Sequence, residues 1–186
     1  SGARDCYESA YREWMKVPQK DSVEIAVVLQ CLGQTATRLG EYNNAIDLYT
    51  QSLDLRKKIF GEMHPRVGMA YLNLGNAYAY SDAYEDAAKA YQKSLEIMTL
   101  SAEDDHLMIA DITRNLAVTL GELGRYQEAI KYHLEAVSIQ RKYKGSFAID
   151  LIDYYSSLAL DYSYIGNFTK AQQALSEMKR ICEHHR

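Results

Sequence analysis

The sequence contains no hydrophobic run of the roughly eighteen residues that a membrane-spanning helix requires. Its longest apolar stretch is Ile25–Leu29, which has the length of a buried core segment. Hydrophobic residues nevertheless make up 47% of the 186 residues, and charged residues make up 25%. This balance predicts a folded chain with a substantial core, and it favours neither a membrane partner nor extended disorder.

Positive charge is not in excess either. The chain has 21 Lys and Arg residues against 25 Asp and Glu residues, which gives a formal net charge of −4 and an isoelectric point near 5.7. Affinity for nucleic acid depends largely on basic side chains that contact phosphates. The composition therefore argues against a nucleic-acid partner.

Cysteine occurs only three times, as Cys6, Cys31 and Cys182. These residues have no short-range pairing, so they indicate neither a disulfide framework nor a CxxC metal site. We expect reduced, buried thiols and a cytoplasmic location. Residues 1–3 are interpreted as a tag remnant, because the chain starts without a methionine or the apolar core of a signal peptide.

Catalytic motifs are also missing, since the sequence has no HExxH, Walker loop, GxGxxG or GxSxG. The residue numbers of His64 and His106 differ by 42, and both lie near predicted helix starts, where capping and packing explain them better than metal binding. His184, His185 and Cys182 have no further ligands at zinc spacing. We therefore expect no enzyme activity, no catalytic residue, no metal and no cofactor.

The chain does repeat one pattern four times at constant spacing. The segments LGEYNNAIDLY, SDAYEDAAKAY, LGRYQEAIKYH and IGNFTKAQQAL begin at positions 39, 81, 123 and 165, so the start number increases by 42 each time. Such regularity indicates an array of similar structural units.

Each repeat contains two groups of residues with helical spacing. In the first repeat the first group is Leu32, Gly33 and Ala36, and the second group is Tyr42, Ala45 and Tyr49. Spacings of three and four place side chains on one face of a helix. We therefore predict two helices per repeat, with Gly33 and Ala45 as points where a neighbouring helix approaches closely. The column of Tyr42 holds Phe168 in the last repeat, which we also expect in the core.

The residues between the two predicted helices fit a tight turn. Gly40, Gly124 and Gly166 occupy the position after the first helix, where a left-handed backbone is expected and glycine adopts it most easily. Asp82 stands at this position in the second repeat, and aspartate tolerates the left-handed conformation better than most residues. Pro65 suits the first turn of a following helix.

These columns resemble the tetratricopeptide pattern, whose usual period is about 34 residues. The longer period here adds about one turn to each helix. Together with GEMHPRVGMAYLNLG at residues 61–75, LEIM and RNLA, it is similar to the repeats of kinesin light chains. The resemblance implies an all-α fold, a right-handed solenoid of antiparallel helix pairs whose first helices line a concave groove.

The same phase divides the chain into units. The four repeats are predicted to cover residues 18–60, 61–102, 103–144 and 145–186. Residues 4–17 match the second helix of a preceding, truncated repeat. Because the ends of such an array are apolar, a homodimer could form through Tyr7, Tyr11 and Trp14 or through the last helix.

The resemblance also implies a peptide-binding site on the first helices. In the long-repeat family an asparagine just before the repeated leucine typically hydrogen-bonds the backbone of a bound peptide. Asn73 and Asn115 match this pattern, whereas Cys31 and Ser157 depart from it, so the resemblance favours the middle of the groove. The predicted peptide-binding residues are Asn73, Asn115, Asn76, Arg114, Gln34, Arg38, Tyr80 and Glu122.

Two functions follow from this site. The first is an adaptor that binds a peptide segment of a partner protein in the groove. The alternative is a structural or self-associating spacer within a larger receptor or effector. The charges of the predicted groove are mixed, with Arg38 and Arg114 near Asp111, Glu122 and Asp153, so they give little support to a preference for acidic ligands.

Overall fold

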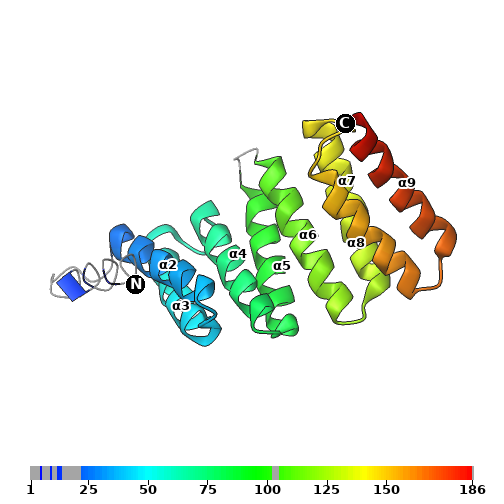
Figure 1. Cartoon of the computed structure of the whole chain (residues 1–186). Helices are drawn as coiled ribbons and strands as arrows, with labels where there is room; N and C mark the ends of the chain where they lie inside the picture. Colours follow the sequence, from blue (N-terminus) through cyan, green and yellow to red (C-terminus); the bar gives the residue numbers. More distant parts are fainter. Residues whose placement is uncertain (1–4, 6–8, 10–11, 14–21, 102–104, 186) are drawn as a thin grey trace. The chain divides into compact units, whose positions relative to one another are not determined.

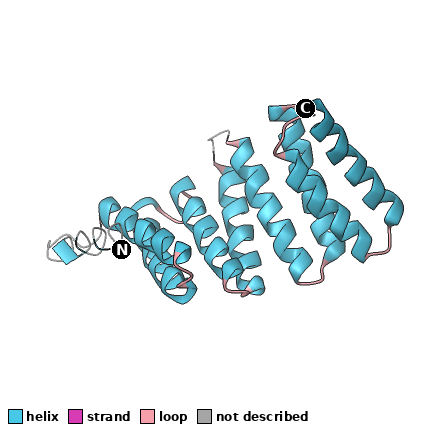
Figure 2. Ribbon diagram, viewed as in Figure 1, coloured by secondary structure: helices cyan, strands magenta, loops and turns pink. Residues whose placement is uncertain are grey.

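The computed structural model describes residues 5, 9, 12, 13, 22–101 and 105–185. These residues contain helices and no strands (Figure 2). The helices are α2 (Val23–Arg38), α3 (Tyr42–Phe60), α4 (Pro65–Tyr80), α5 (Tyr84–Leu100), α6 (His106–Glu122), α7 (Tyr126–Lys144), α8 (Leu151–Tyr164) and α9 (Phe168–His184). The predicted all-α fold of repeated helix pairs is confirmed.

The turn inside each helix pair has the same conformation in all four repeats. First helices end at Arg38, Tyr80, Glu122 and Tyr164, and second helices begin at Tyr42, Tyr84, Tyr126 and Phe168, so both boundaries recur with the period of the sequence. Gly40, Gly124 and Gly166 have φ angles of 77°, 72° and 74°, and Asp82 has a φ of 60°. The prediction of a left-handed turn residue, including the aspartate, is therefore confirmed.

The connection between α3 and α4 ends at a residue that caps the N-terminus of α4. Gly61 has a φ of 84° after α3, and Pro65 is the first residue of α4. The backbone N–H of Arg66 donates to Nδ1 of His64 at 3.1 Å, which makes His64 the N-cap of α4. His106 begins α6 and stacks on Tyr143 at 4.4 Å between ring centroids. Both histidines have the capping and packing roles that the sequence predicts.

The chain divides into two compact units, Ser1–Glu103 and Asp104–Arg186. In the first unit α2 packs on α3, α3 on α4 and α4 on α5 (Figure 1). Its main apolar cluster consists of Ala36, Ala45, Tyr49, Leu53, Val67, Ala70, Leu74, Ala77 and Ile97. The second unit repeats this arrangement with α6 to α9, and its cluster includes Leu151, Tyr154, Leu158 and Ile181.

In the first two repeats the small residue of the first helix faces a tyrosine of the second. A Cβ atom built on Gly33 would lie 2.7 Å from the Tyr49 ring, and one built on Gly75 would lie 2.8 Å from the Tyr91 ring. The later repeats hold Ala117 with His133, and Ala159 with Leu175, at the same positions. Glycine is thus required where the partner is a tyrosine, and alanine occurs where it is smaller.

This fit predicts that Gly75→Ala destabilises the chain by about 1 kcal/mol, because the clash with the buried Tyr91 ring outweighs the better helix propensity of alanine. In the Tyr91→His background, which recreates the pair found in the third repeat but lacks the Tyr91–Asn76 hydrogen bond, Gly75→Ala should cost much less. Urea unfolding followed by circular dichroism measures both. An equal effect of Gly75→Ala in the two backgrounds would contradict the steric explanation.

Two predictions about buried side chains are wrong. Cys31 and Cys182 are partly exposed free thiols, and Cys6 lies outside the described residues. Phe168 is 71% exposed and is not a core residue. The equivalent residues Tyr42 and Tyr126 are partly covered because they stack on Tyr80 and Tyr164, whereas among the described residues no aromatic ring stacks on Phe168.

The predictions about the chain start and the array ends are not tested by the structure. Residues 1–3, the tag remnant, lie outside the described residues, and so do Tyr7, Tyr11 and Trp14. Of the helix expected over 4–17, only residues 5, 9, 12 and 13 are described, and they are helical.

Candidate functional site

Five of the predicted peptide-binding residues belong to the first unit. Gln34 and Arg38 are exposed on α2, and Tyr80 is exposed at the end of α4. Asn73 and Asn76 are partly buried on the same helix. Two of the five already hold helices together, because the Tyr91 hydroxyl donates to Asn76 Oδ1 at 2.7 Å and the Tyr80 ring stacks on Tyr42 at 5.9 Å.

The other three, Arg114, Asn115 and Glu122, lie on α6 in the second unit. Arg114 and Asn115 are partly buried, whereas Glu122 is exposed. The Arg114 guanidinium lies 5.4 Å from the centroid of the Tyr154 ring, an arrangement that is favourable between a cation and an aromatic face. All eight residues are therefore on first helices, as predicted. Their meeting in one peptide groove remains a prediction, because the set is divided between the two units.

A buried polar cluster that the sequence analysis did not predict lies between α6, α7 and α8. His133 Nε2 is 3.3 Å from Asp161 Oδ2, and the two side chains are 1% and 8% exposed. Gln140 Nε2 donates to the Tyr154 hydroxyl at 3.0 Å, and this hydroxyl donates to Asp111 Oδ1 at 2.8 Å. The cluster connects the first helix pair of this unit with the second.

The cluster also holds buried atoms that lack hydrogen bonds. In the part of the chain that the structure describes, four buried side-chain atoms have no hydrogen-bond partner, namely Arg114 Nε, His133 Nδ1, Gln140 Oε1 and Asp161 Oδ2. The contact between His133 and Asp161 is therefore close without having the geometry of a hydrogen bond. Unpaired buried polar atoms are costly and uncommon in folded proteins. All four belong to this cluster, so the junction is less well satisfied than the rest of the described core.

Burial sets the protonation of the His133–Asp161 pair. It lowers the pKa of His133 to about 4, and the positive charge of Arg114 acts in the same direction. It raises the pKa of Asp161 to about 6. At neutral pH the imidazole is therefore neutral, and the closed environment suits a packing role for the pair rather than catalysis.

The signal that could have revealed this pair was present in the repeat columns. His133 stands where the first two repeats have Tyr49 and Tyr91. Asp161 stands in a column that holds Ala77 in the second repeat, where the side chain is fully buried. Polar residues at two buried column positions were the available signal, although the columns alone do not show that the two side chains face each other.

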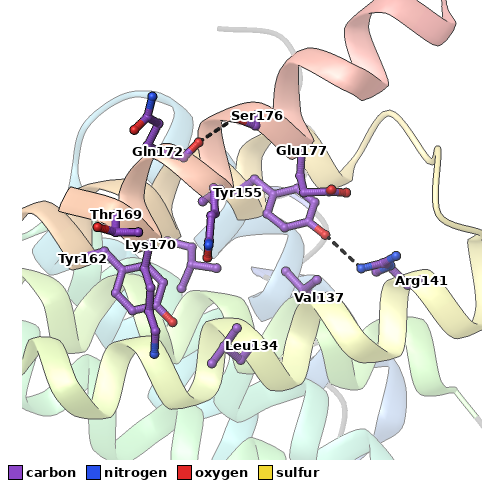
Figure 3. Close-up of a pocket in the computed structure, with 13 residues that line it drawn as sticks. Leu134, Val137, Arg141, Tyr155, Tyr162, Thr169, Lys170, Gln172, Ser176 and Glu177 are labelled. Carbon is purple, nitrogen blue, oxygen red and sulfur yellow. Dashed lines mark hydrogen bonds between the residues drawn. The ribbon is translucent and has the colours of Figure 1, made fainter. Parts of the chain in front are cut away.

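A pocket of about 700 Å³ opens between α7 and α9 (Figure 3). Its lining residues come from α7 (Leu134, Val137, Arg141), from α8 (Tyr155, Leu158, Tyr162) and from α9 (Thr169, Lys170, Gln172, Gln173, Ala174, Ser176, Glu177). None of the eight predicted peptide-binding residues is among them. The pocket is thus built mainly from second helices, whereas the predicted groove uses first helices.

The described residues offer neither a metal site nor a membrane span. They contain no group of three or more His, Cys, Asp and Glu side chains placed to hold a metal ion. No helix among them combines the length and the apolar composition needed to cross a membrane.

Comparison with known families gives a match over most of the chain. The family profile described as "Tetratricopeptide repeat" matches residues 24–99 and 108–183. Each matched segment covers two of the four repeats.

Individual relatives are more distant. The chain is 23% identical to the RxLR effector protein SFI4 of Phytophthora infestans, over 83% of this chain and 46% of that protein. It is 26% identical to Protein KINESIN LIGHT CHAIN-RELATED 3 of Arabidopsis thaliana, over 96% of this chain and 30% of that protein. The chain thus spans less than half the length of these curated relatives.

Among solved structures, BtubC (BKLC) from P. vanneervenii superposes with a TM-score of 0.86 at 20% identity, covering 99% of this chain and 73% of that one. A set of nearly identical TPR-like repeats from Podosopora anserina superposes with a TM-score of 0.85 at 19% identity, covering 98% and 87%. These likenesses concern the fold.

Proposed function

The chain belongs to the tetratricopeptide repeat family, with repeats of the kinesin-light-chain type, and we propose that it is an adaptor that binds a peptide segment of a partner protein on its first helices. Repeats of this family are generally protein-interaction scaffolds and are not an enzyme fold. The partner segment would contact the first-helix side chains that the sequence pattern selects.

The observation that carries this proposal is the pair Asn73 and Asn115. They occupy equivalent positions of successive repeats, on α4 and α6, and each side chain is partly exposed within its own unit. An amide side chain both donates and accepts hydrogen bonds, which matches the N–H and C=O groups of an extended peptide. Gln34, Arg38 and Glu122 are exposed on first helices and are proposed as further contacts, each within its own unit.

We expect the double change Asn73→Ala and Asn115→Ala to leave the helical content unchanged and to abolish pulldown of partner proteins from cell extract. The reason is that two partly exposed amides lose their hydrogen bonds to the peptide while no large side chain leaves the core. The matched control is Asn43→Ala with Gln127→Ala, which removes two exposed amides from the second helices α3 and α7. Partners that survive the first double change would refute the adaptor proposal.

The alternative function is a self-associating spacer. It is favoured by the exposed apolar side chains on α9, since Phe168 is 71% and Leu175 is 46% exposed. It is opposed by Gln172 and Lys179, which stand on α9 at positions where α7 has the buried residues Ile130 and Val137. A sedimentation experiment on the Phe168→Ser variant distinguishes the two, because only the spacer requires a dimer that this change dissolves.

We further propose a cytoplasmic location. The free thiols of Cys31 and Cys182 support it, because partly exposed thiols persist best in a reducing compartment.

A further inference from the structure

We propose that the pocket between α7, α8 and α9 is a second docking site, which takes an acidic peptide segment carrying apolar side chains. This inference goes beyond the proposed function, because the pocket contains none of the first-helix residues assigned to the peptide groove. The pocket lies wholly within the second unit, so its geometry does not depend on the first.

The base of the pocket is apolar and well packed. Tyr155, Leu158 and Tyr162 of α8 and Val137 of α7 are all buried, so they form a fixed surface. Leu134 of α7 is 46% exposed at the rim, where it is available to cover an incoming side chain. The apolar base thus lies opposite a largely polar wall from α9, and the volume of about 700 Å³ is within the usual size range of binding pockets.

Two of the α9 residues that line the pocket have small side chains. Ala174 stands where α7 has Tyr132, and Ser176 stands where α7 has Leu134. The lining of α9 runs from Thr169 to Glu177. At a rise of about 1.5 Å per residue this length is roughly 12 Å, which accommodates about four residues of an extended peptide.

Positive charge marks the two ends of the pocket. The Lys170 ammonium lies 5.4 Å from the centroid of the Tyr162 ring, and Arg141 Nη1 donates to the Tyr155 hydroxyl at 3.4 Å (Figure 3). Among the described residues neither cation forms an ion pair. Both are therefore available to a carboxylate of the ligand.

The single carboxylate of the lining does not reverse this charge. Glu177 Oε1 lies 3.4 Å from Arg180 Nη1 and is balanced by it. The exposed amides of Gln172 and Gln173 add groups that can hydrogen-bond a peptide backbone. An apolar base between two cations, with amides along one wall, is complementary to a short segment with apolar residues between two acidic ones.

The test measures binding of a fluorescent synthetic peptide in which leucine and glutamate alternate, with a leucine–lysine peptide for comparison. We expect the glutamate peptide to bind and the lysine peptide to bind at least tenfold more weakly. Arg141→Glu, Lys170→Glu and Leu134→Asp should each weaken binding of the glutamate peptide by roughly tenfold or more. These three side chains are at the surface or rim, and circular dichroism verifies that each variant folds.

The matched controls are Lys142→Glu and Lys179→Glu, which reverse exposed cations on α7 and α9 outside the lining. They should retain binding within about threefold. Equal binding of both peptides, no binding of the glutamate peptide, or equal loss in the control variants would overturn the proposal. The proposal would also be overturned if only the double change Asn73→Ala with Asn115→Ala weakened binding of the glutamate peptide. If that double change leaves pulldown of partner proteins intact, the result refutes only the adaptor proposal.

Discussion

His133→Leu is expected to destabilise the chain by about 2 kcal/mol at pH 7.5, because it replaces the polar neighbour of a buried carboxylate with an apolar group. The Asp161 carboxylate loses the imidazole that lies 3.3 Å away. Removing one partner of a buried polar pair is much more costly than removing both. The double variant His133→Leu with Asp161→Ala should therefore be at least as stable as the natural chain, as measured by urea unfolding.

The single variants should differ in the direction of their pH dependence. The pKa of Asp161 is raised to about 6 in the folded chain, so its contribution to stability is present at low pH and is lost as the pH rises through 6. The pKa of His133 is lowered to about 4, so its contribution is present above its ordinary pKa near 6.5 and is lost as the pH falls through 4.

Between pH 4 and 6 these two contributions oppose each other, so the stability of the natural chain should change little from this pair. His133→Leu keeps only the aspartate, and its stability should fall as the pH rises, by at most about 1.4 kcal/mol per pH unit. Asp161→Ala keeps only the histidine, and its stability should rise by a similar amount. Urea titrations at several pH values measure the slopes, and slopes of the same sign would refute this account of the pair.

Ala87→Leu is expected to lower the free energy of unfolding by about 3 kcal/mol, because it overpacks a buried contact between helices. Ala87 is completely buried on α5, which packs against α4. Ala129 is equally buried at the equivalent position of α7, and its replacement by leucine should have the same effect. Thermal and urea unfolding measure both changes.

The control for this prediction is Lys89→Leu on the same helix. The Lys89 side chain is 74% exposed and pairs only with Asp86 in the structure, so the substitution should change stability by no more than about 0.5 kcal/mol. A neutral result for Ala87→Leu would mean that the aligned alanines are not contact points.

The helix boundaries and turns were predictable because they depend on local chemistry that recurs with a fixed period. The turn positions of Gly40 and Asp82 have a left-handed backbone, and few residue types adopt this conformation easily. The close contact at Gly75 was predictable as well, because a residue without a side chain inside an apolar stripe indicates a close helix approach. At these positions a single column of the repeat was sufficient to predict the local backbone conformation or the helix contact.

The two sites that sequence analysis missed depend on pairs of columns from different helices. His133 shares its column with Tyr49 and Tyr91, and Asp161 shares its column with Thr35 and Thr119, so neither residue stands out when its column is considered alone. Their meaning appears only when α7 lies against α8 and the two side chains face each other. The pocket likewise depends on which side chains α9 leaves small, namely Ala174 and Ser176, and a periodic pattern does not report empty space.

The matching of small and large residues within each pair, seen at Gly75 with Tyr91 and at Ala117 with His133, limits how the repeats can be recombined. Grafting the first helix of the third repeat onto the second helix of the second would place an alanine methyl against a tyrosine ring. Exchanging a complete helix pair keeps the small residue of the first helix together with the side chain of the second helix that packs on it. Chimaeras of this chain should therefore tolerate crossovers between hairpins and reject those inside them.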